Sequence, residues 1–525
     1  MEISLRERLA REEGTIIKDW GGRLPIALVY PNSYYIGMSN LGLHALYSLL
    51  NRHRDIVCER AFWERDNQER KISPVSIESR RPLSDFKAVA FTISYEVDYF
   101  NVISILKASG IPPFSADRDE SHPLIIAGGP CITANPMPLA PFFDGFGIGE
   151  AEKLLPGLLP LISDTINGRR EELLRSLASL PGMYVPLIPP ASPVTRQWAE
   201  DLDDFPVSSA ILSRDTELGD LYLIEVERGC PWRCRFCLVN NIFKPMRFRS
   251  VDTLLIQAEE GLRHRKRLGL VGPAVFDYPH LEKLLTGLRR MGAQFSMGSM
   301  RASNLPDRIL ADIVSGGART ITLAPEAGSE RLRQFIDKGI CEADIAGVVD
   351  RLASHGVKQL KLYFMIGLPT ETDDDIAEIA SLALKCKGIL DRKPKGTRLS
   401  LNIAPFVPKA GTPFQRLPMT PVEILTQRIA RLKSSLAPRG IQLKCESPAW
   451  SQVQAVLARG DTSVARALND IEENSLAGWR RAAAKCQLDT DFYAHQKWEE
   501  SQKLPWAVID TRADKAPDRK LREPD

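Results

Sequence analysis

Three thiols lie within eight positions of the sequence, in the segment ERGCPWRCRFC. Cys230, Cys234 and Cys237 follow a Cys-x3-Cys-x2-Cys spacing, and an aromatic residue, Phe236, directly precedes the third. Structural zinc sites usually use four ligands, commonly in two separated pairs, but no second pair follows here. Three thiolates can hold a [4Fe–4S] cluster and leave its fourth iron open to a small ligand. The spacing therefore predicts a reactive [4Fe–4S] cluster, with a zinc site that has a remote fourth ligand as the alternative.

The positions of these cysteines in the expected fold agree with such chemistry. From Leu221 onward, six strand candidates alternate with helical stretches, which predicts a partial (β/α)6 barrel with its chemistry at the carboxyl ends of the strands. The cysteine segment directly follows the first strand candidate, so the cluster is expected at the barrel mouth. The strand candidates read YLIEVE, GLVGPAVF, AQFSMGSM, ARTITLAP, VKQLKLYFMIG and RLSLNIAPF.

A second α/β region precedes the barrel. Between residues 24 and 160, the buried-strand patterns LPIALVYP, KAVAFTISY and PLIIAGGP alternate with helical stretches, as in a Rossmann-like parallel sheet. Glycine-rich turns follow the strand ends, where open α/β sheets bind ligands. The part after the barrel is mostly helical. The expected divisions are an N-terminal extension (1–23), the Rossmann-like domain (24–180), a linker (181–219), the barrel (220–420), a helical C-terminal domain (421–510) and a disordered tail (511–525).

Composition narrows the class of protein. The chain has 525 residues, a net charge of +3 and nine cysteines, and it lacks an apolar leader or a membrane-length apolar stretch. We therefore expect a cytoplasmic protein in a reducing compartment, without membrane association and without an implied DNA partner. The basic run at 263–267 is interpreted as a solvated helix end, with an RNA phosphate patch as the alternative. The six other cysteines are expected to be small buried hydrophobes.

The cysteine motif and its position resemble the radical S-adenosylmethionine (SAM) superfamily. In that family the open iron binds SAM, and an electron from the cluster cleaves SAM to methionine and a 5′-deoxyadenosyl radical. Further segments carry the resemblance: TLAPEAGSERLRQFIDKG, LYFMIGLPTETDDD and NIAPFVPKAGTPF. They imply that Glu326 contacts SAM and that Gly367, Leu368 and Pro369 line its pocket. These segments resemble the branch that includes methylthiotransferases and cobalamin-dependent members.

Two strand ends are less regular. Most family members carry a Gly-Gly-Glu-like segment after strand two, whose backbone receives the SAM amino group, but this sequence reads VGPAVFDYPH. Gly272 still offers close backbone approach, although Pro273 has no N–H to donate. After strand three, Ser299 and Arg301 are candidates for the ribose and carboxylate of SAM, with a surface ion pair as the alternative for Arg301.

The first domain resembles the cobalamin-binding domain of corrinoid-dependent radical SAM enzymes. IIAGGPCITANPMPLAPFFDGFGIGEAEKLL carries this resemblance, and Gly128 and Gly129 would allow the nucleotide tail of the corrinoid to approach. The Asp-x-His-x-x-Gly motif that ligates cobalt in many such proteins is absent. We therefore expect a corrinoid without a protein histidine on cobalt, or a domain that kept its fold and lost the ligand. Met38, Tyr34 and Tyr95 are candidates to cover the lower cobalt face, and His44, His53 and His122 are expected on helix surfaces or in loops.

Over nearly its full length, the chain also resembles an uncharacterised radical SAM family often fused or linked to a small domain of unknown function. The resemblance implies a radical SAM enzyme, with cobalamin-dependent methylation of an unactivated carbon as one reaction. Cobalamin-independent modification of RNA or protein, or of a small molecule, is the alternative, and an iron–sulfur scaffold or sensor is a further one. The expected partners are a reducing protein, such as flavodoxin or ferredoxin, and a substrate that the sequence does not identify.

Overall fold

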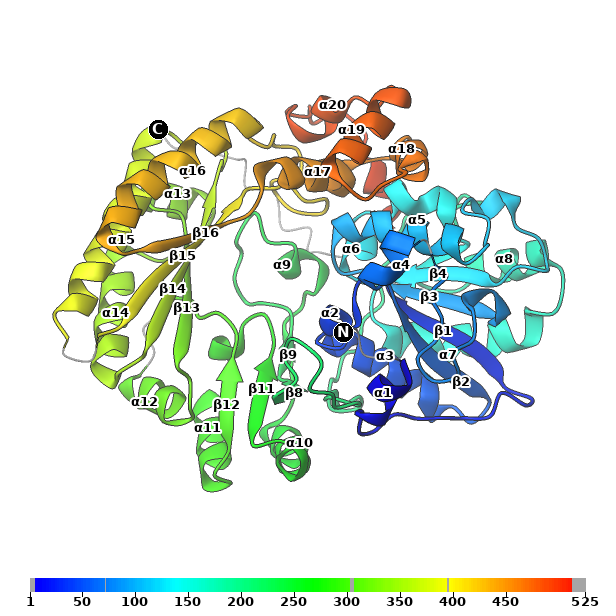
Figure 1. Cartoon of the computed structure of the whole chain (residues 1–525), viewed down its shortest axis with the longest axis horizontal. Coiled ribbons are helices and arrows are strands. Elements are labelled where there is room, and N and C mark those ends of the chain that lie inside the picture. The colour runs from blue at the N-terminus through cyan, green and yellow to red at the C-terminus, as the bar shows by residue number, and fades with distance from the viewer. Residues whose placement is uncertain (1–4, 71, 303–305, 394–395, 512–525) are drawn as a thin grey trace. The chain divides into compact units, whose positions relative to one another are not determined.

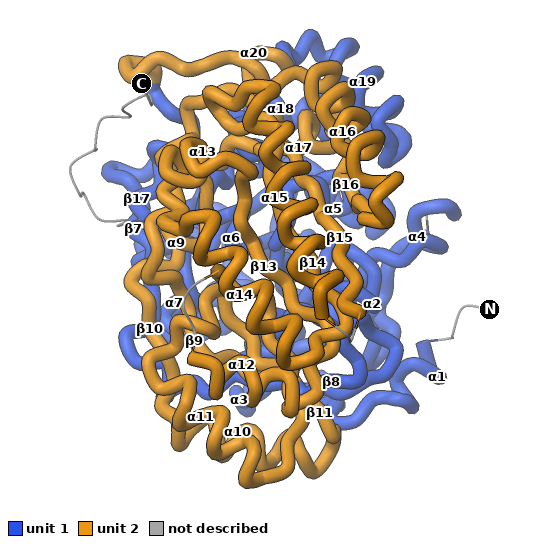
Figure 2. Tube along the Cα trace, turned by 90° about the vertical axis from the view of Figure 1, so that its left-hand side faces the viewer, with its two compact units in different colours: residues 1–222, 457–490, 503–513 blue, residues 223–456, 491–502, 514–525 orange. Residues whose placement is uncertain are grey.

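The computed structural model describes residues 5–70, 72–302, 306–393 and 396–511. It divides into two compact units, coloured separately in Figure 2. The first comprises residues 1–222, 457–490 and 503–513, and the second comprises residues 223–456, 491–502 and 514–525. The segment expected to form one helical C-terminal domain, 421–510, is therefore shared between both units, and the expected linker, 181–219, belongs to the first. The expected tail lies outside the described residues beyond Thr511.

The first unit is built on a six-stranded sheet in the order β2-β1-β3-β4-β5-β6 (Figure 1). Its strands are parallel except β6, which pairs antiparallel with β5. The order reverses between β1 and β3, which is the switch point where doubly wound sheets bind ligands. The strands are β1 (Leu24–Tyr30), β2 (Ile56–Phe62), β3 (Ala88–Thr92), β4 (Leu124–Gly128), β5 (Gly145–Gly147) and β6 (Met183–Tyr184).

Helices cover this sheet because their apolar stripes pack on strands whose residues are nearly all buried. The helices of this unit are α1 (Leu5–Ala10), α2 (Tyr34–Gly37), α3 (Leu41–Arg52), α4 (Arg65–Arg70), α5 (Tyr99–Ala108), α6 (Pro130–Ala134), α7 (Ala151–Thr165), α8 (Arg170–Ala178), α18 (Val464–Asp470) and α19 (Leu476–Lys485). A short parallel pair, β7 (Val194–Thr195) with β17 (Ile509–Asp510), also lies here. The 3-10 turns are η1 (Leu83–Asp85), η2 (Glu96–Asp98), η3 (Ser115–Asp117), η4 (Met137–Phe142) and η7 (Pro505–Val508).

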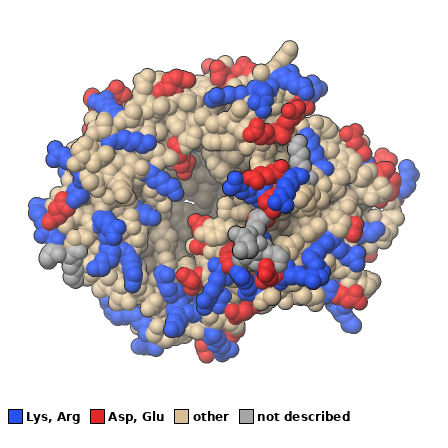
Figure 3. All heavy atoms as spheres, in the orientation of Figure 1, with Lys and Arg blue, Asp and Glu red and all other residues tan. Residues whose placement is uncertain are grey.

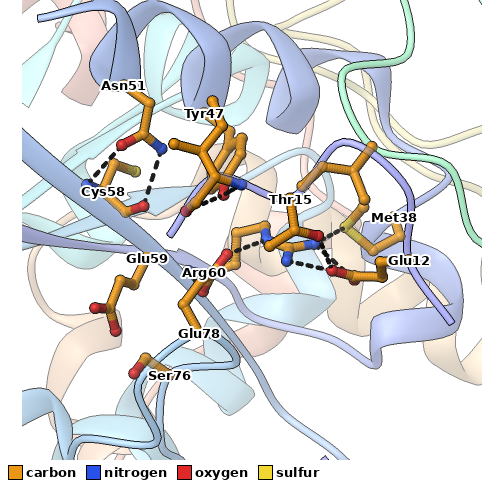
Figure 4. A network of polar contacts seen from close by, with 12 residues as sticks. Glu12, Thr15, Met38, Tyr47, Asn51, Cys58, Glu59, Arg60, Ser76 and Glu78 are labelled. Atoms are coloured by element: carbon orange, nitrogen blue, oxygen red, sulfur yellow. Dashed lines mark hydrogen bonds and ion pairs between the residues drawn. The ribbon is translucent and has the colours of Figure 1, made fainter. Parts of the chain in front are cut away.

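A buried ion network ties the N-terminal extension to strand β2 (Figure 4). Arg60, which is fully buried, donates to both carboxylate oxygens of Glu12 at 2.9 and 2.7 Å and to Glu78 at 2.7 Å. Tyr34 and Thr15 donate to the same Glu12 carboxylate. The described part of the N-terminal extension is thus anchored to the first unit through the buried Glu12 side chain.

The second unit contains the expected barrel strands in two parallel sheets, ordered β12-β11-β8 and β13-β14-β15-β16. A parallel bridge between Met300 and Leu323 joins them, with Met300 N–H donating to the Thr322 carbonyl at 2.7 Å. The strand candidates of the sequence correspond to β8 (Leu221–Glu225), β11 (Arg267–Val271), β12 (Gln294–Met297), β13 (Thr320–Glu326), β14 (Gln359–Ile366) and β15 (Arg398–Pro405). A further strand, β16 (Gln442–Cys445), extends the sheet beside β15.

Helices follow the strands, as a (β/α) repeat requires, and pack on the buried alternate residues of each strand. They are α10 (Val251–His264), α11 (Leu281–Arg290), α12 (Asp307–Ser315), α13 (Glu330–Phe335), α14 (Glu342–His355), α15 (Asp373–Asp391) and α16 (Val422–Leu436), with 3-10 turns η5 (Val275–Asp277) and η6 (Ala437–Arg439). The helices α17 (Pro448–Arg459) and α20 (Thr490–Ala494) each cross a unit boundary. Within the described ranges, every helix is too short or too polar to span a lipid bilayer.

Candidate functional site

The cysteine segment forms a loop closed at its base by two short antiparallel strands, β9 (Glu227–Arg228) and β10 (Arg247–Phe248). Gly229 has a φ of +88°, and a Cβ there would lie 2.6 Å from the Phe243 carbonyl oxygen, so only glycine fits this turn. Within the loop lies the one-turn helix α9 (Val239–Ile242). The buried amide of Asn240 donates to the Cys234 carbonyl at 2.9 Å, and that of Asn241 donates to the Cys237 carbonyl at 2.7 Å. The two amides hold the backbone that carries the second and third cysteines.

The three thiols are free of disulfides. Cys234 is buried, and Cys230 and Cys237 are half-buried. Burial raises the pKa of Cys230 to about 11, and negative charge on Cys237 and Cys234 adds to this effect. Among the described residues, no set of three Cys, His, Asp or Glu side chains is gathered around a single ion position. A cluster differs from a single ion because each thiolate binds a different iron, so three soft donors on one pinned loop fit a [4Fe–4S] group.

Two cations and a carboxylate surround the Cys234 thiol. Burial raises its pKa, while Lys338 and Arg301 act to lower it and Glu326 acts to raise it. Lys338 Nζ donates to Glu326 Oε1 at 3.0 Å, and both side chains are largely buried. Glu326 ends β13 at a bulge with a φ of +69°, an unusual conformation for a residue with a side chain. The resemblance placed Glu326 on SAM, and the structure places it beside the cluster loop.

Arg301 stacks on the loop as well. Its guanidinium lies 3.7 Å from the ring centre of Trp232, and the Trp232 indole N–H donates to Asp277 at 2.8 Å. Arg301 is nine-tenths buried, and its Nη1 has no hydrogen-bond partner among the described residues. A buried guanidinium nitrogen without an acceptor is suited to donate to a carboxylate ligand, and the role of Arg301 at the SAM carboxylate stays a prediction. Ser299 is exposed beyond the end of β12.

The turn at Gly367, Leu368 and Pro369 is fixed by one buried carboxylate. Gly367 has a φ of +77°, and its N–H donates to Glu371 Oε2, which also accepts from Arg428 Nη1 at 2.7 Å. Burial raises the pKa of Glu371 to about 7, against the opposing effects of the Gly367 N–H and Arg428. Leu368 is almost completely buried, whereas Pro369 is half-buried. Leu368 therefore contributes packing to this turn.

Two of the motif segments are locked together by Asp375. It accepts from the Ser329 hydroxyl and the Arg331 guanidinium of the strand-four segment, and from Thr372 N–H of the strand-five segment at 2.7 Å. Phe236 of the cysteine loop packs against an apolar cluster that contains Ala327 of the strand-four segment and Leu368 of the strand-five segment. The structure thus brings together the cysteine, Glu326 and Gly367 segments, which are far apart in the sequence.

At the end of strand two, the structure fills the space that Gly272 was expected to leave for a ligand. A Cβ on Gly272 would lie 2.3 Å from Glu227 Oε1, so the missing side chain makes room for this carboxylate. Glu227 Oε1 accepts from Ala274 N–H at 2.6 Å, and its buried Oε2 has no partner among the described residues. Burial raises the pKa of Glu227 to about 8, although the Ala274 N–H acts against this shift.

Sequence reasoning did not identify Asn240, Asn241, Lys338 or Glu227. Their partners are backbone carbonyls and side chains that only the fold brings near. Residue type alone therefore carried no signal for Asn240, Asn241 or Lys338. Glu227 is the exception, because an acidic residue at the end of a buried strand and three positions before Cys230 is an unusual placement.

In the first unit, the two glycines after β4 have different roles. Gly129 has a φ of +117°, and a Cβ there would lie 2.5 Å from the Ile93 carbonyl oxygen, so the turn itself requires glycine. Gly128 is open, since a Cβ would make only ordinary contact, at 3.7 Å from the Gly147 oxygen. Only Gly128 therefore remains a position where the absence of a side chain could serve a ligand.

The candidates for the lower cobalt face are also divided by the structure. Met38 and Tyr34 are buried, with Met38 Sδ accepting from Arg60 at 3.3 Å and Tyr34 donating to Glu12, while Tyr95 is 45% exposed after β3. The expectation that His44 lies on a helix surface or in a loop is wrong. It is buried, its Nε2 contacts the Met38 carbonyl, and its Nδ1 accepts from the N–H groups of Ala210 and Ile211.

The basic run at 263–267 is partly neutralised by its own helix. Arg263 pairs with Glu260 at 2.8 Å and with Glu259 at 3.6 Å, and His264 contacts Glu260 at 3.3 Å. On the face shown in Figure 3, basic and acidic side chains are likewise intermixed. The pairing of Arg263 and His264 with acidic residues of the same helix favours a solvated helix end over an RNA patch.

Comparisons with known proteins identify the family of this chain. The family described as "Radical SAM proteins, N-terminal" matches residues 42–186, and "Radical SAM superfamily" matches residues 224–383. An uncharacterized protein of Methanocaldococcus jannaschii is 33% identical over 449 residues, covering 85% of this chain and 90% of the relative. An uncharacterized methyltransferase of Pyrococcus horikoshii is 24% identical over 315 residues, covering 57% of this chain and 64% of the relative.

Among solved structures, the cobalamin-dependent S-adenosylmethionine radical enzyme OxsB, with aqua-cobalamin and SAM bound, matches with a TM-score of 0.50 at 13% identity. The match covers 78% of this chain and 62% of OxsB, so this chain spans less than two thirds of that enzyme. At this identity the likeness concerns the fold, which is α/β with a Rossmann-like first part and a radical SAM barrel.

The chain belongs to the radical SAM superfamily, and it is a radical SAM enzyme. Membership implies a [4Fe–4S] cluster and SAM, for which Cys230, Cys234 and Cys237 are the only closely spaced cysteines in the sequence.

Proposed function

We propose that this enzyme is a cobalamin-dependent radical SAM methyltransferase that methylates an unactivated carbon. The observation that carries the proposal is the carboxyl edge of the first unit's sheet, where the switch point lies between β1 and β3 and the open Gly128 ends β4, the strand next to β3. The names of two similar proteins support it, since OxsB is a cobalamin-dependent enzyme and the P. horikoshii relative is an uncharacterized methyltransferase.

The residues of the second unit would hold the cluster and SAM. Cys230, Cys234 and Cys237 would bind three irons, which leaves one iron for the amino and carboxylate groups of SAM. When bound, the reduced cluster supplies the electron that cleaves SAM. The buried Arg301 Nη1 would donate to the SAM carboxylate, and the Lys338–Glu326 pair would present a positioned carboxylate to hydroxyl or ammonium donors of SAM.

No histidine is proposed as a cobalt ligand. Both ring nitrogens of His44 are engaged within the protein, so this histidine would not bind cobalt, and the exposed Tyr95 would be the candidate to contact the corrinoid. A reducing protein such as flavodoxin or ferredoxin would supply electrons in the cytoplasm.

The corrinoid assignment is tested by anaerobic purification of protein expressed with cobalamin, followed by absorption spectroscopy and hydroxocobalamin titration. Gly128→Phe should abolish the bound corrinoid without unfolding the unit, because the backbone at this position accepts a Cβ. Gly157→Phe, on an exposed face of α7, is the matched control. Wild-type protein that neither retains nor binds corrinoid would exclude this function and leave cobalamin-independent radical chemistry.

The cluster and SAM sites are tested separately. A triple alanine variant of Cys230, Cys234 and Cys237 should lose about four irons per chain after anaerobic reconstitution. Glu326→Gln should weaken SAM binding with the cluster retained, because it removes a charge-assisted acceptor. SAM affinity that is unchanged in Glu326→Gln would contradict the role given to this carboxylate.

A further inference from the structure

The inward face of the barrel sheet carries a row of polar and basic residues. In β14, the side chains of Leu360, Leu362 and Phe364 are buried, and the residues between them are at least partly exposed. Since side chains alternate across a strand, Gln359, Lys361 and Tyr363 share the opposite face. Gln359 confirms this by contacting Thr320 at 3.4 Å and Ser400 at 3.2 Å across both neighbouring strands.

Register extends this polar face over β15 and β16. Lys361 stands opposite Ser400, which stands opposite Gln442, and in the next row Asn402 stands opposite Lys444. Together with Lys433 of α16, these residues line a hollow of about 710 Å³, a size typical of small-molecule sites. The lining residues are Gln359, Lys361, Ser400, Leu401, Asn402, Lys433, Ala437, Gly440, Ile441, Gln442, Leu443 and Lys444.

The hollow has a strong imbalance of charge. Three lysines line it and no carboxylate does. The side chains of Lys361, Lys433 and Lys444 form no hydrogen bond or ion pair with any other described residue. Lys361 is half-buried on a strand with neighbours on both sides. Burying a lysine there costs folding free energy unless another group compensates its charge.

Strands about 4.8 Å apart and residues about 3.3 Å apart place the Cα atoms of Lys361 and Lys444 roughly 12 Å from each other. Two lysine side chains can span that distance to one anion.

We propose that this hollow binds the anionic end, a phosphate or a carboxylate, of an extended small-molecule substrate. The role as a substrate site rests on the radical SAM function, whereas anion binding itself does not. Lys361 lies five residues before Ile366, at the end of the strand that leads into the Gly367 turn, which corresponds to roughly 17 Å along the strand. The substrate would therefore be long enough to reach from the lysines past Tyr363 to the cluster end of the barrel. Ser400, Asn402 and Gln442 would supply neutral hydrogen bonds to the same group.

Calorimetric titration of the anaerobic, cluster-loaded protein with inorganic pyrophosphate and, separately, with citrate tests the proposal. Wild-type protein should bind at least one probe, and the tighter probe identifies the phosphate or carboxylate class. Lys361→Met combined with Lys444→Met should weaken binding roughly tenfold or more, because two nearby charges are lost. Lys283→Met, which removes an exposed lysine of α11, should leave binding unchanged. Circular dichroism melting of each variant shows that folding is retained.

The outcomes separate this inference from the proposed function. Wild-type protein that cleaves SAM but binds neither probe would overturn the anion site alone. Equal weakening by the Lys283 control, or no weakening in the double variant, would show nonspecific charge binding only and would likewise overturn it. Protein that binds the probe through Lys361 and Lys444 but forms no 5′-deoxyadenosine would retain the site and contradict the radical function.

Discussion

Replacement of Arg60 should destabilise the first unit strongly, because this arginine compensates two buried carboxylates (Figure 4). Its side chain is 1% exposed, and those of Glu12 and Glu78 are 0% and 1% exposed. Burial opposes the ionisation of Glu12, but hydrogen bonds and charge from Arg60 hold the pKa of its carboxyl below the usual value. Removing one partner of a buried pair typically costs about 3–5 kcal/mol of unfolding free energy. We expect Arg60→Met to lose an amount in this range.

The pH dependence provides a second signature. In Arg60→Met both carboxylates would have folded-state pKa values above their unfolded values, so the folded state would bind more protons than the unfolded state. The loss of unfolding free energy in Arg60→Met, relative to wild type, should therefore shrink as the pH falls from about 7 toward about 4. Urea unfolding at several pH values measures this effect, with Arg65→Met, in an exposed pair with Glu69, as the control. A deficit below about 1 kcal/mol, or one that does not change with pH, would refute the reasoning.

Three further changes have expected outcomes. Asn241→Leu should lower iron content after reconstitution, because it frees the Cys237 carbonyl; iron equal to wild type would contradict this. Gly129→Ala should lower the melting temperature of the first unit by adding a strained φ and a clash with the Ile93 oxygen, whereas Gly128→Ala should not. Burial raises the pKa of Asp98 from 3.8 to about 7. The protonated carboxyl therefore stabilises the fold at low pH, and this contribution is lost as the pH rises toward 7. The loss of unfolding free energy is at most about 4 kcal/mol. Asp98→Asn should flatten this slope in pH-dependent unfolding, and an unchanged slope would exclude Asp98 as its source.

The sequence predicted the barrel well because its strands are long, apolar and regularly followed by helices. It did not predict β2, although this strand lies next to β1 at the edge of the first sheet. The strand reads IVCERAF, and its two charged residues, Glu59 and Arg60, break the apolar pattern. Both are buried because partners from distant segments satisfy them, Trp20 and Ser79 for Glu59 and Glu12 and Glu78 for Arg60. A pattern method reads such a strand as a surface segment.

The candidate site divides in the same way. Cys230, Cys234 and Cys237 could be identified because their chemistry depends on spacing within eight positions. Gly272 and Gly129 were recognised as special, but a glycine in the sequence does not reveal whether its missing side chain makes room for a ligand or for the protein. The structure assigns the space at Gly272 to the Glu227 carboxylate and the space at Gly129 to the Ile93 carbonyl.

Lys361 and Lys444 show that the alternation of apolar and polar residues along a strand is informative about function, in addition to motifs. In QLKLYFMI, apolar residues alternate with Gln359, Lys361 and Tyr363, which is the pattern of a strand with one buried and one solvent-exposed face. In a barrel whose interior is filled by apolar layers, the inward face would also be apolar. The alternation therefore indicates an interior left open to solvent or to a ligand. Because β15 and β16 repeat this alternation in register, with Ser400, Asn402, Gln442 and Lys444 on the same face, the opening extends over all three strands. Function is then to be sought in the charge of this face as well as in the cluster loop.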